Sequence, residues 1–314
     1  KMLLLQLVLL SCLLLAAATS ALTDQLNICQ DEFSTKGGFI VHHTNCRDYE
    51  DDAALAGAQF DEDHDLWIRN GTIEDIGQLL NGSLYNISKL RISDMVEAGN
   101  SPIEVFPIDS GRFSTLELTN DGIAELRIPE PDYRLTHLNV ARNKLKVLGN
   151  VKELKVLKSL TFDGNELEHV SMDDFMEMPE LFSISLAGNR IRTISAEQQI
   201  MIVKLRALDI SDNQLSQLDV TQWKFPQLVS FYMHDNQLNR IVGLRGKFKN
   251  VWDISMGGTN RWDCAWFDKV LEYLKQDRKF AMKMFGDPLN CTEESRMVGF
   301  ICCTNPEDDG ENTV

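Results

Sequence analysis

The segment Leu135-Thr-His-Leu138-Asn-Val140-Ala-Arg-Asn143-Lys-Leu145 decides the fold of this chain. An apolar residue is followed by others three, five and ten positions on, and an asparagine stands eight positions after the first. Repeats of this pattern start at residues 113, 135, 157, 181, 205, 228 and 251, a step of 22 to 24 residues, and the five from 135 to 228 match at every position. A fixed period of this kind indicates stacked repeats.

The consensus is that of the leucine-rich repeat, LxxLxLxxNxL. Each short strand turns its alternate apolar side chains inward, and the asparagine bonds backbone groups that the following turn leaves unpaired. The asparagine column is therefore structural. Because no single repeat closes a core, we predict an α/β solenoid, a leucine-rich-repeat horseshoe with a parallel concave β-sheet and disulfide-bonded N- and C-terminal caps.

Two degenerate repeats precede the regular ones, with Leu66 and Ile68 in the apolar positions of one and Leu90 and Ile92 in those of the other. The second apolar position then recurs at residues 66, 90, 116, 138, 160, 184, 208, 231 and 254, which predicts about nine units. The predicted segments are a signal peptide (1–21), an N-terminal cap (22–62), the repeats (63–260), a C-terminal cysteine cap with a helix (261–303) and a disordered acidic tail (304–314).

The first residues have the features of a secretory signal peptide: an apolar run from residue 3 to 18, followed by the small residues Thr19, Ser20 and Ala21. The run is shorter than the roughly 20 residues that a transmembrane helix needs. We therefore expect a secreted, extracellular protein. The formal net charge of -16 disfavours a nucleic-acid or polyphosphate partner.

The cysteines outside the signal peptide flank the repeats, as disulfides that tie down the two caps would require: Cys29, Cys46, Cys264, Cys291, Cys302 and Cys303. A Cys29–Cys46 bridge is predicted in the N-terminal cap. The spacing of the six cysteines matches no paired CxxC signature, which argues against a zinc site.

Asn-x-Ser/Thr acceptor sequences predict N-glycosylation at Asn70, Asn81, Asn86 and Asn290. Three of these lie near the N-terminal end, where glycans would discourage docking. We therefore expect the ligand surface on the middle and C-terminal repeats.

The strand positions between the buried leucines predict which side chains face the concave surface. The central column reads Glu117, Asn139, Thr161, Ser185, Asp209, Tyr232 and Ser255. Carboxylates gather toward the C-terminal end with aromatic residues, which bury much area at little entropic cost. The alternative is an ordinary solvated sheet. The candidate binding residues are Arg142, Asp163, Phe182, Asp209, Asp212, Tyr232, His234, Asp235, Trp252 and Asp253.

An enzyme is not predicted. His137, His169 and His234 fall in different repeats, and no serine or cysteine motif accompanies them. No catalytic residue, metal site or cofactor is assigned.

The repeats give way to Asn260-x-Trp262-x-Cys264-x-Trp266, the signature of a C-terminal leucine-rich-repeat cap. Apolar residues from Trp266 to Leu274 then fall at helical spacing, which predicts a helix that covers the last repeat's core. Gly286, Asp287 and Pro288 end the helical segment.

The signal peptide, the irregular N-terminal cap, the 22- to 24-residue repeats, the Cys264-x-Trp266 cap and the doublet Cys302-Cys303 together resemble the leucine-rich immune proteins of mosquitoes. In that family the longer members continue past the doublet into a coiled coil. They form disulfide-linked complexes and circulate in haemolymph bound to complement-like thioester proteins that mark pathogens. No heptads follow the doublet here, so the resemblance is to the short, coil-less branch.

Adjacent cysteines seldom bond to each other, so Cys302 and Cys303 should have separate partners. Two bridges within the cap, or one bridge with the remaining thiols linking chains, both fit the sequence. We favour closure within the monomer, because Cys264, Cys291 and the doublet all fall in one cap.

The leading interpretation is a secreted, glycosylated recognition protein of insect innate immunity. Its expected partner is an extracellular protein, such as a complement-like thioester protein or another leucine-rich-repeat protein, or a microbial surface. The alternative is an extracellular-matrix or adhesion protein on the same solenoid. Abundance in haemolymph after infection would favour the first.

Overall fold

The structure, a computed structural model, describes residues 64–69, 87–94, 104–108, 113–244, 246–275, 281–282, 295–298 and 301–305. The chain divides into two compact units. The first comprises residues 1–103 and 116–121, and the second comprises residues 104–115 and 122–314.

The first unit contains the strands of the two degenerate repeats and of the repeat after them. Strand β1 (His64–Arg69) pairs in parallel with β2 (Ile87–Ser93), and β4 (Thr115–Thr119) follows β2 in the sheet. The register joins Leu66 to Leu90 and Ile68 to Ile92, so the apolar positions assigned from sequence are equivalent. Arg91 forms an ion pair with Glu117 at 3.2 Å across this sheet.

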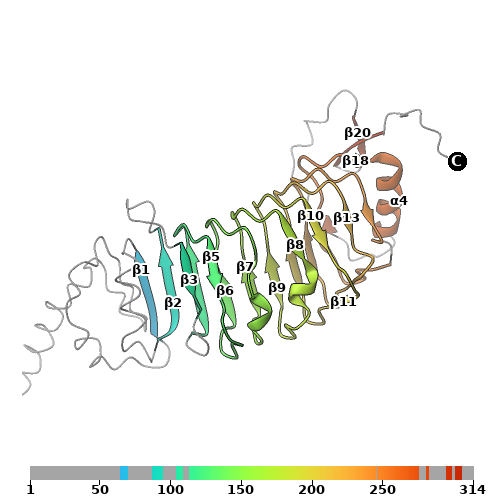
Figure 1. The fold of residues 1–314 in the computed structure, drawn as a ribbon. Helices are drawn as coiled ribbons and strands as arrows, with labels where there is room; N and C mark the ends of the chain where they lie inside the picture. The colour runs from blue at the N-terminus through green and yellow to red at the C-terminus, as the bar shows by residue number, and fades with distance from the viewer. Residues whose placement is uncertain are drawn as a thin grey trace, which may run out of the picture. The chain divides into compact units, whose positions relative to one another are not determined.

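The second unit is a parallel β-solenoid whose principal sheet has one short strand from each coil (Figure 1). The strands, in sheet order, are β6 (His137–Asn139), β7 (Ser159–Thr161), β9 (Ser183–Ser185), β12 (Ala207–Asp209), β15 (Ser230–Tyr232), β17 (Asp253–Ser255) and β19 (Ala281–Met282). The middle residue of each strand from β6 to β17 points into the core and is at most 1% exposed. Each strand therefore buries its middle side chain between two that face outward, which confirms the predicted solenoid of stacked coils.

Asparagines join each coil to the one before it. The Nδ2 of Asn165 donates to the carbonyl oxygens of Phe162 in its own coil and Val140 in the preceding coil, both at 2.9 Å. Its Oδ1 accepts the N–H of Leu145 at 3.0 Å. The same arrangement recurs at Asn189, Asn213, Asn236 and Asn260. The predicted structural role of the asparagine column is confirmed.

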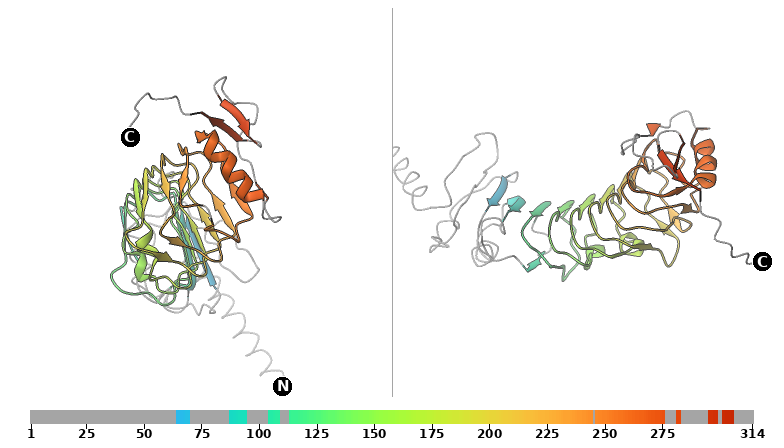
Figure 2. Two further views of the ribbon diagram at one scale, coloured as in Figure 1. Left: turned by 90° about the vertical axis from the view of Figure 1, so that its right-hand side faces the viewer. Right: turned by 90° about the horizontal axis from the view of Figure 1, so that it is seen from above.

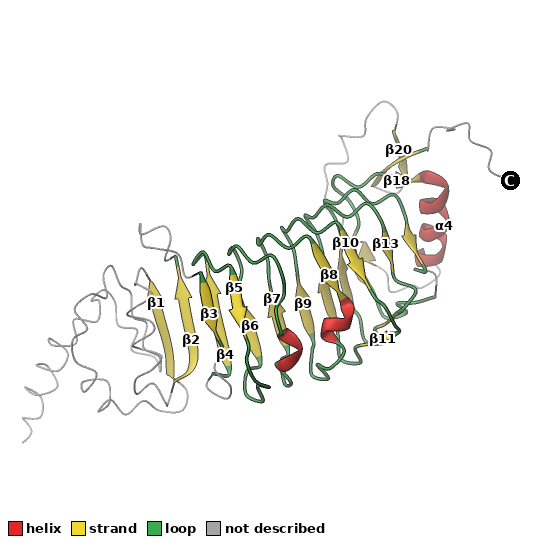
Figure 3. Ribbon diagram, viewed as in Figure 1, coloured by secondary structure: helices red, strands yellow, loops and turns green. Residues whose placement is uncertain are grey.

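On the opposite side of the coils, the second unit carries shorter and less regular elements (Figure 3). The paired strands are β3 (Val105–Pro107) with β5 (Glu125–Arg127), β8 (His169–Ser171) with β10 (Thr193–Ser195), β11 (Ile200–Met201) with β14 (Trp223–Lys224), and β13 (Leu218–Asp219) with β16 (Ile241–Val242). The 3₁₀ helices η1 (Val151–Glu153) and η2 (Met172–Phe175) complete this side.

The C-terminal end of the second unit is a cap built on one helix and a small sheet (Figure 2). Helix α4 (Cys264–Lys275) includes the stretch from Trp266 to Leu274 that was predicted to be helical, and Phe267 and Leu271 on it are buried. The prediction that the helical segment ends only at Gly286 is wrong, because β19 already occupies Ala281–Met282. The sheet has the order β18 (Trp262–Asp263), β21 (Ile301–Thr304) and β20 (Ser295–Val298). A disulfide joins Cys264 to Cys303.

Both members of the cysteine doublet are disulfide-bonded, and since Cys303 pairs with Cys264, the two have separate partners as predicted. The doublet lies in β21, a strand that the sequence did not predict. That strand ends at Thr304, one residue inside the predicted disordered tail.

Several predictions fall outside the described residues: the signal peptide, the N-terminal cap with Cys29 and Cys46, the glycosylation sites Asn70, Asn81, Asn86 and Asn290, Cys291, and the tail from residue 306. Among the described residues, no helix combines the length and the apolar character that a membrane span requires.

Candidate functional site

The candidate site is the outer face of the principal sheet in the second unit, meaning the face turned away from the core. The strand registers align Asn139, Thr161, Ser185, Asp209, Tyr232 and Ser255 in one column, as the sequence predicted. Glu117, the remaining member of the predicted column, lies in the first unit. Because adjacent strands lie about 4.8 Å apart, side chains from neighbouring coils can contact a single ligand.

An edge stripe runs along the start of the strands and consists of Lys158, Phe182, Arg206, Val229 and Trp252. The backbone N–H of each stripe residue donates to the carbonyl oxygen of the stripe residue in the preceding coil, and that of Lys158 donates to Thr136. The N···O distances are 2.7 to 3.1 Å. Phe182 and Trp252 are each 46% exposed, a high fraction for large apolar side chains. Arg206 lies over the Phe182 ring, 5.6 Å from its centroid, in a cation–π contact.

Lys158, Arg206 and Val229 were missed from the sequence. They occupy the position directly after the first leucine of the repeat, the same position as Phe182 and Trp252, so the column itself was the available signal. Tryptophan and arginine are the residue types enriched at the energetic centres of protein interfaces. The edge stripe is thus the most interface-like part of the outer face.

Carboxylates and hydroxyls lie at the other end of the strands, three to five residues after the stripe position of each coil. Asp163 Oδ1 accepts hydrogen bonds from Ser185 Oγ at 2.6 Å and from the Ala187 N–H at 3.0 Å. Burial, and to a smaller extent the negative charge of Asp209, raise the pKa of the Asp163 carboxyl against the opposing effect of these bonds. Asp209 in turn accepts from Ser211 Oγ at 2.6 Å.

Charged side chains also lie in the turn after the strands, at the position that directly precedes the consensus asparagine of each repeat. We call this position the turn column. Arg142, Asp212 and Asp235 have φ values of 59°, 51° and 54°, in the left-handed region. Glycines fill the same position in other coils, as at Gly164 and Gly188 with φ of 65° and 66°. A non-glycine residue there is held in a less favourable backbone conformation, so these three side chains are retained at some cost in backbone energy.

At the C-terminal end of the outer face, two residues that were predicted to face the solvent are buried. Asp253 is only 4% exposed and accepts a hydrogen bond from the Tyr232 hydroxyl, and Ser255 is fully buried. Strand β19, which the sequence did not predict, pairs with β17 and makes β17 an interior strand. Asp253 is therefore a partner of Tyr232 within the fold, while Trp252 remains open; His234 and Asp235 are half-buried.

His137 and His169 belong to strands of different sheets. His137 Nδ1 lies 2.8 Å from Thr136 Oγ1, and His169 Nδ1 lies 2.6 Å from Thr193 Oγ1 on the opposite side of the coils. Within the described ranges, no three His, Cys, Asp or Glu side chains are grouped as metal ligands would be. The arrangement suits binding across several coils.

Comparison with known proteins agrees with this architecture. Residues 133–191 match the family model described as leucine rich repeat. The fold is that of a leucine-rich-repeat domain. This architecture is typical of binding proteins that are not enzymes. Curated protein sequences give no match to the chain.

The similar solved structures include two leucine-rich-repeat domains. That of APL1B aligns with a TM-score of 0.60 at 16% identity, over 77% of this chain and 72% of that one. That of LRIM1 aligns with a TM-score of 0.59 at 16% identity, over 87% of this chain and 93% of that one. The LRIM1/APL1C complex gives 0.51 at 15% identity, over 77% of this chain and 46% of that one. At such identities the likeness is one of fold.

Proposed function

We propose that this chain is a secreted recognition protein of insect innate immunity that binds a protein partner or a microbial surface through the outer face of its repeats. The observation that carries the proposal is the edge stripe, in which an exposed tryptophan, an exposed phenylalanine and an arginine follow one another on successive coils. The sequence resemblance to the leucine-rich immune proteins of mosquitoes supports the immune role, and the fold likeness to APL1B and LRIM1 supports a leucine-rich-repeat binding domain. LRIM1 itself assembles with APL1C.

The chemistry of the outer face favours a partner that presents apolar and basic groups together. Phe182 and Trp252 offer apolar area, whereas Asp163, Asp209 and Asp212 offer carboxylates further along the coils, three to six residues after the stripe position of the same coil. A complement-like thioester protein or another leucine-rich-repeat protein is the expected partner. Electrostatic complementarity would then set the association rate, and the aromatic contacts would set the lifetime of the complex.

The proposal is tested by removing the edge stripe. The tagged protein, secreted into haemolymph and recovered before and after bacterial challenge, should co-purify with a thioester-containing or leucine-rich-repeat protein. The double variant Arg206→Ala, Trp252→Ala should bind that partner at least about tenfold more weakly, since interface arginines and tryptophans commonly contribute more than about 1.4 kcal/mol each.

A matched control changes one aromatic residue and one arginine that are exposed away from the stripe, Tyr133→Ala with Arg240→Ala. It should retain wild-type binding. Equal recovery of the partner with wild type and with the stripe variant would contradict the assignment of the outer face. Recovery of neither a protein nor bacterial cells with the wild type would contradict the function.

Asp212→Gly separates binding from folding. Asp212 is exposed, has φ of 51°, and its side chain makes no hydrogen bond within the described part of the chain. Glycine adopts this conformation without strain, so the free energy of unfolding should stay level or rise by up to about 1 kcal/mol. Partner binding should weaken, as measured by biolayer interferometry. A variant that loses stability and binding together would show that Asp212 serves the fold.

A further inference from the structure

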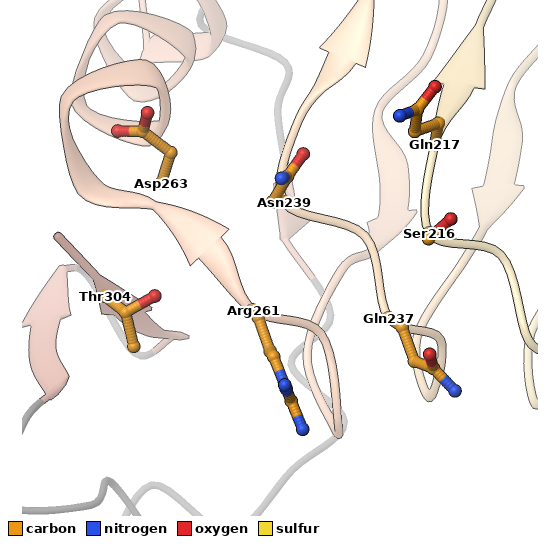
Figure 4. A pocket seen from close by; sticks show the side chains of 7 residues that line it. All are labelled: Ser216, Gln217, Gln237, Asn239, Arg261, Asp263 and Thr304. Atoms are coloured by element: carbon orange, nitrogen blue, oxygen red, sulfur yellow. The ribbon is translucent and has the colours of Figure 1, made fainter. Parts of the chain in front are cut away.

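A second surface feature lies away from the outer face, where the last coils meet the C-terminal cap. It is a hollow of about 430 Å³ (Figure 4). Three successive coils line it with Ser216 and Gln217, Gln237 and Asn239, and Arg261 and Asp263. Thr304 of β21 adds a wall from the cap. Its volume lies within the range of about 300–1,000 Å³ that is usual for small-ligand sites.

The floor of the hollow is held in place by backbone hydrogen bonds between coils. The N–H groups of Gln237, Arg261 and Asp263 donate to the carbonyls of Leu215, Leu238 and Asn239 at 2.8 to 2.9 Å. The apolar residues between these positions, Leu238 and Trp262, are fully buried, so their neighbours point outward. The backbone positions of the lining residues are therefore fixed.

The wall is fixed as well. Asp263 and Thr304 are paired residues of the parallel strands β18 and β21, and the Cys264–Cys303 disulfide joins the adjacent positions. Asp263 Oδ1 accepts the N–H groups of Ala265 and Trp266 at 2.8 and 3.1 Å, at the start of α4. One carboxylate oxygen thus holds the helix, and the other is left for a ligand.

The side chains of the hollow differ from those at equivalent positions of the preceding coils. There the polar groups bond to one another: Arg190 pairs with Glu166 at 3.5 Å, and Arg192 Nε donates to Gln214 Oε1 at 3.3 Å. In the hollow, Gln237, Asn239 and Arg261 make no side-chain hydrogen bond or ion pair to any described residue. Their bonding groups face solvent.

The structure assigns this hollow as a saccharide site. Each of its three carboxamides offers two donors and an acceptor, Arg261 offers donors only, and Asp263 offers an acceptor. A ligand that matches them carries many groups able both to donate and to accept, as sugar hydroxyls do. All seven lining residues are polar, so the hollow offers no apolar side chains to favour a hydrophobic ligand. The lining carries one guanidinium and one carboxylate, so it has no net charge to hold a multivalent anion.

The test uses the full secreted chain with three probes: N,N′-diacetylchitobiose, maltotriose and trigalacturonate. Saturation-transfer NMR titrations should show binding of an uncharged probe, with a dissociation constant on the order of 1 mM because these contacts replace contacts with water. Gln237→Ala with Asn239→Ala should weaken that binding by about tenfold or more. Both residues are exposed, so thermal unfolding should be unchanged.

Gln222→Ala with Gln227→Ala is the matched control, because both glutamines are exposed in the same region of the chain but do not line the hollow. It should bind the probe as wild type does. Three findings would overturn the assignment: no uncharged probe binds up to its solubility limit, trigalacturonate alone binds and is released by high salt, or both double variants lose binding equally.

Discussion

Asn189 shows how one side chain holds three stretches of backbone. Its Nδ2 donates to the carbonyls of Phe162 and Leu186 at 2.9 and 3.0 Å, and its Oδ1 accepts the Leu167 N–H at 3.1 Å. All these groups are buried. Removing the amide leaves the Leu167 N–H without its acceptor, and the carbonyls of Phe162 and Leu186 each lose one hydrogen bond while keeping those from Asn165 and Asn213. Each orphaned group costs about 1–3 kcal/mol when no water replaces the bond.

Asn189→Ala should therefore lower the free energy of unfolding by about 3 kcal/mol, measured by urea denaturation followed by circular dichroism. Asn150→Ala is the matched control, because Asn150 is exposed and its side chain does not cap η1. It should change stability by less than about 0.5 kcal/mol. If the free energy of unfolding falls equally in the two variants, the hydrogen bonds between coils are not the main way in which these asparagines stabilise the fold.

Asp163 gives a pH-dependent prediction. Burial raises the pKa of its carboxyl above the ordinary value of 3.8, so the folded protein holds this proton more tightly than the unfolded chain does. The protonated form therefore stabilises the fold at low pH, and this contribution is lost as pH rises through the folded pKa. At neutral pH the ionised carboxylate is a small destabilising element.

Asp163→Asn should raise the melting temperature at pH 7 and leave it unchanged near pH 3, since an amide oxygen can still accept from Ser185 and Ala187. The gain should stay below about 1 kcal/mol because the group is partly exposed. Calorimetry across this pH range measures it, with the exposed Asp212→Asn as control. A gain that is the same at both pH values would rule out the titration of Asp163 as its cause.

At the residue scale, the sequence predicted what the repeat determines. The buried leucines, the asparagine ladder and the central outer-face column follow from the period alone, because each coil repeats the same backbone path. Burial at Asp253 did not follow, because it depends on β19, which comes from beyond the repeats. The sequence could not single out Arg206 from other exposed arginines, because its contact with Phe182 is visible only in the structure.

Among the elements, the C-terminal cap depends most on a covalent link. The Cys264–Cys303 disulfide closes a loop with a sequence separation of 39 residues and holds β21 beside β18 and α4. A loop of this length corresponds to about 4 kcal/mol in the chain-entropy model of disulfide stabilisation. The helix in this cap was predicted from its apolar spacing, whereas β18, β20 and β21 are too short to have a readable period.

Cys303→Ser should lower the melting temperature of the secreted protein and increase protease cleavage after Lys269 and Lys275 in α4, because the cap loses its covalent anchor. Differential scanning calorimetry and limited trypsin digestion under non-reducing conditions measure the two effects. Treatment of the wild type with reductant should reproduce the cleavage pattern. Unchanged melting and cleavage in the variant would show that β-pairing alone holds the cap.

For the molecule as a whole, the formal net charge of -16 bears on both proposed sites, but in different ways. A basic partner is attracted to an acidic protein over distances comparable with the Debye length, about 10 Å at 0.1 M salt. An uncharged saccharide is not. The period of the sequence reveals the outer face in advance, whereas the saccharide hollow depends on Thr304, which the cap brings next to the last coils from outside the repeats.

The association rate constant of the outer-face partner should therefore fall about tenfold between low salt and about 0.5 M salt, while its dissociation rate changes little. Biolayer interferometry at several ionic strengths separates the two constants. Over the same range the saccharide dissociation constant should change by less than about twofold, because an uncharged ligand has no long-range attraction to screen. An association rate that is independent of salt would mean that the carboxylates of the outer face do not face the partner, and that the aromatic contacts alone make the interface.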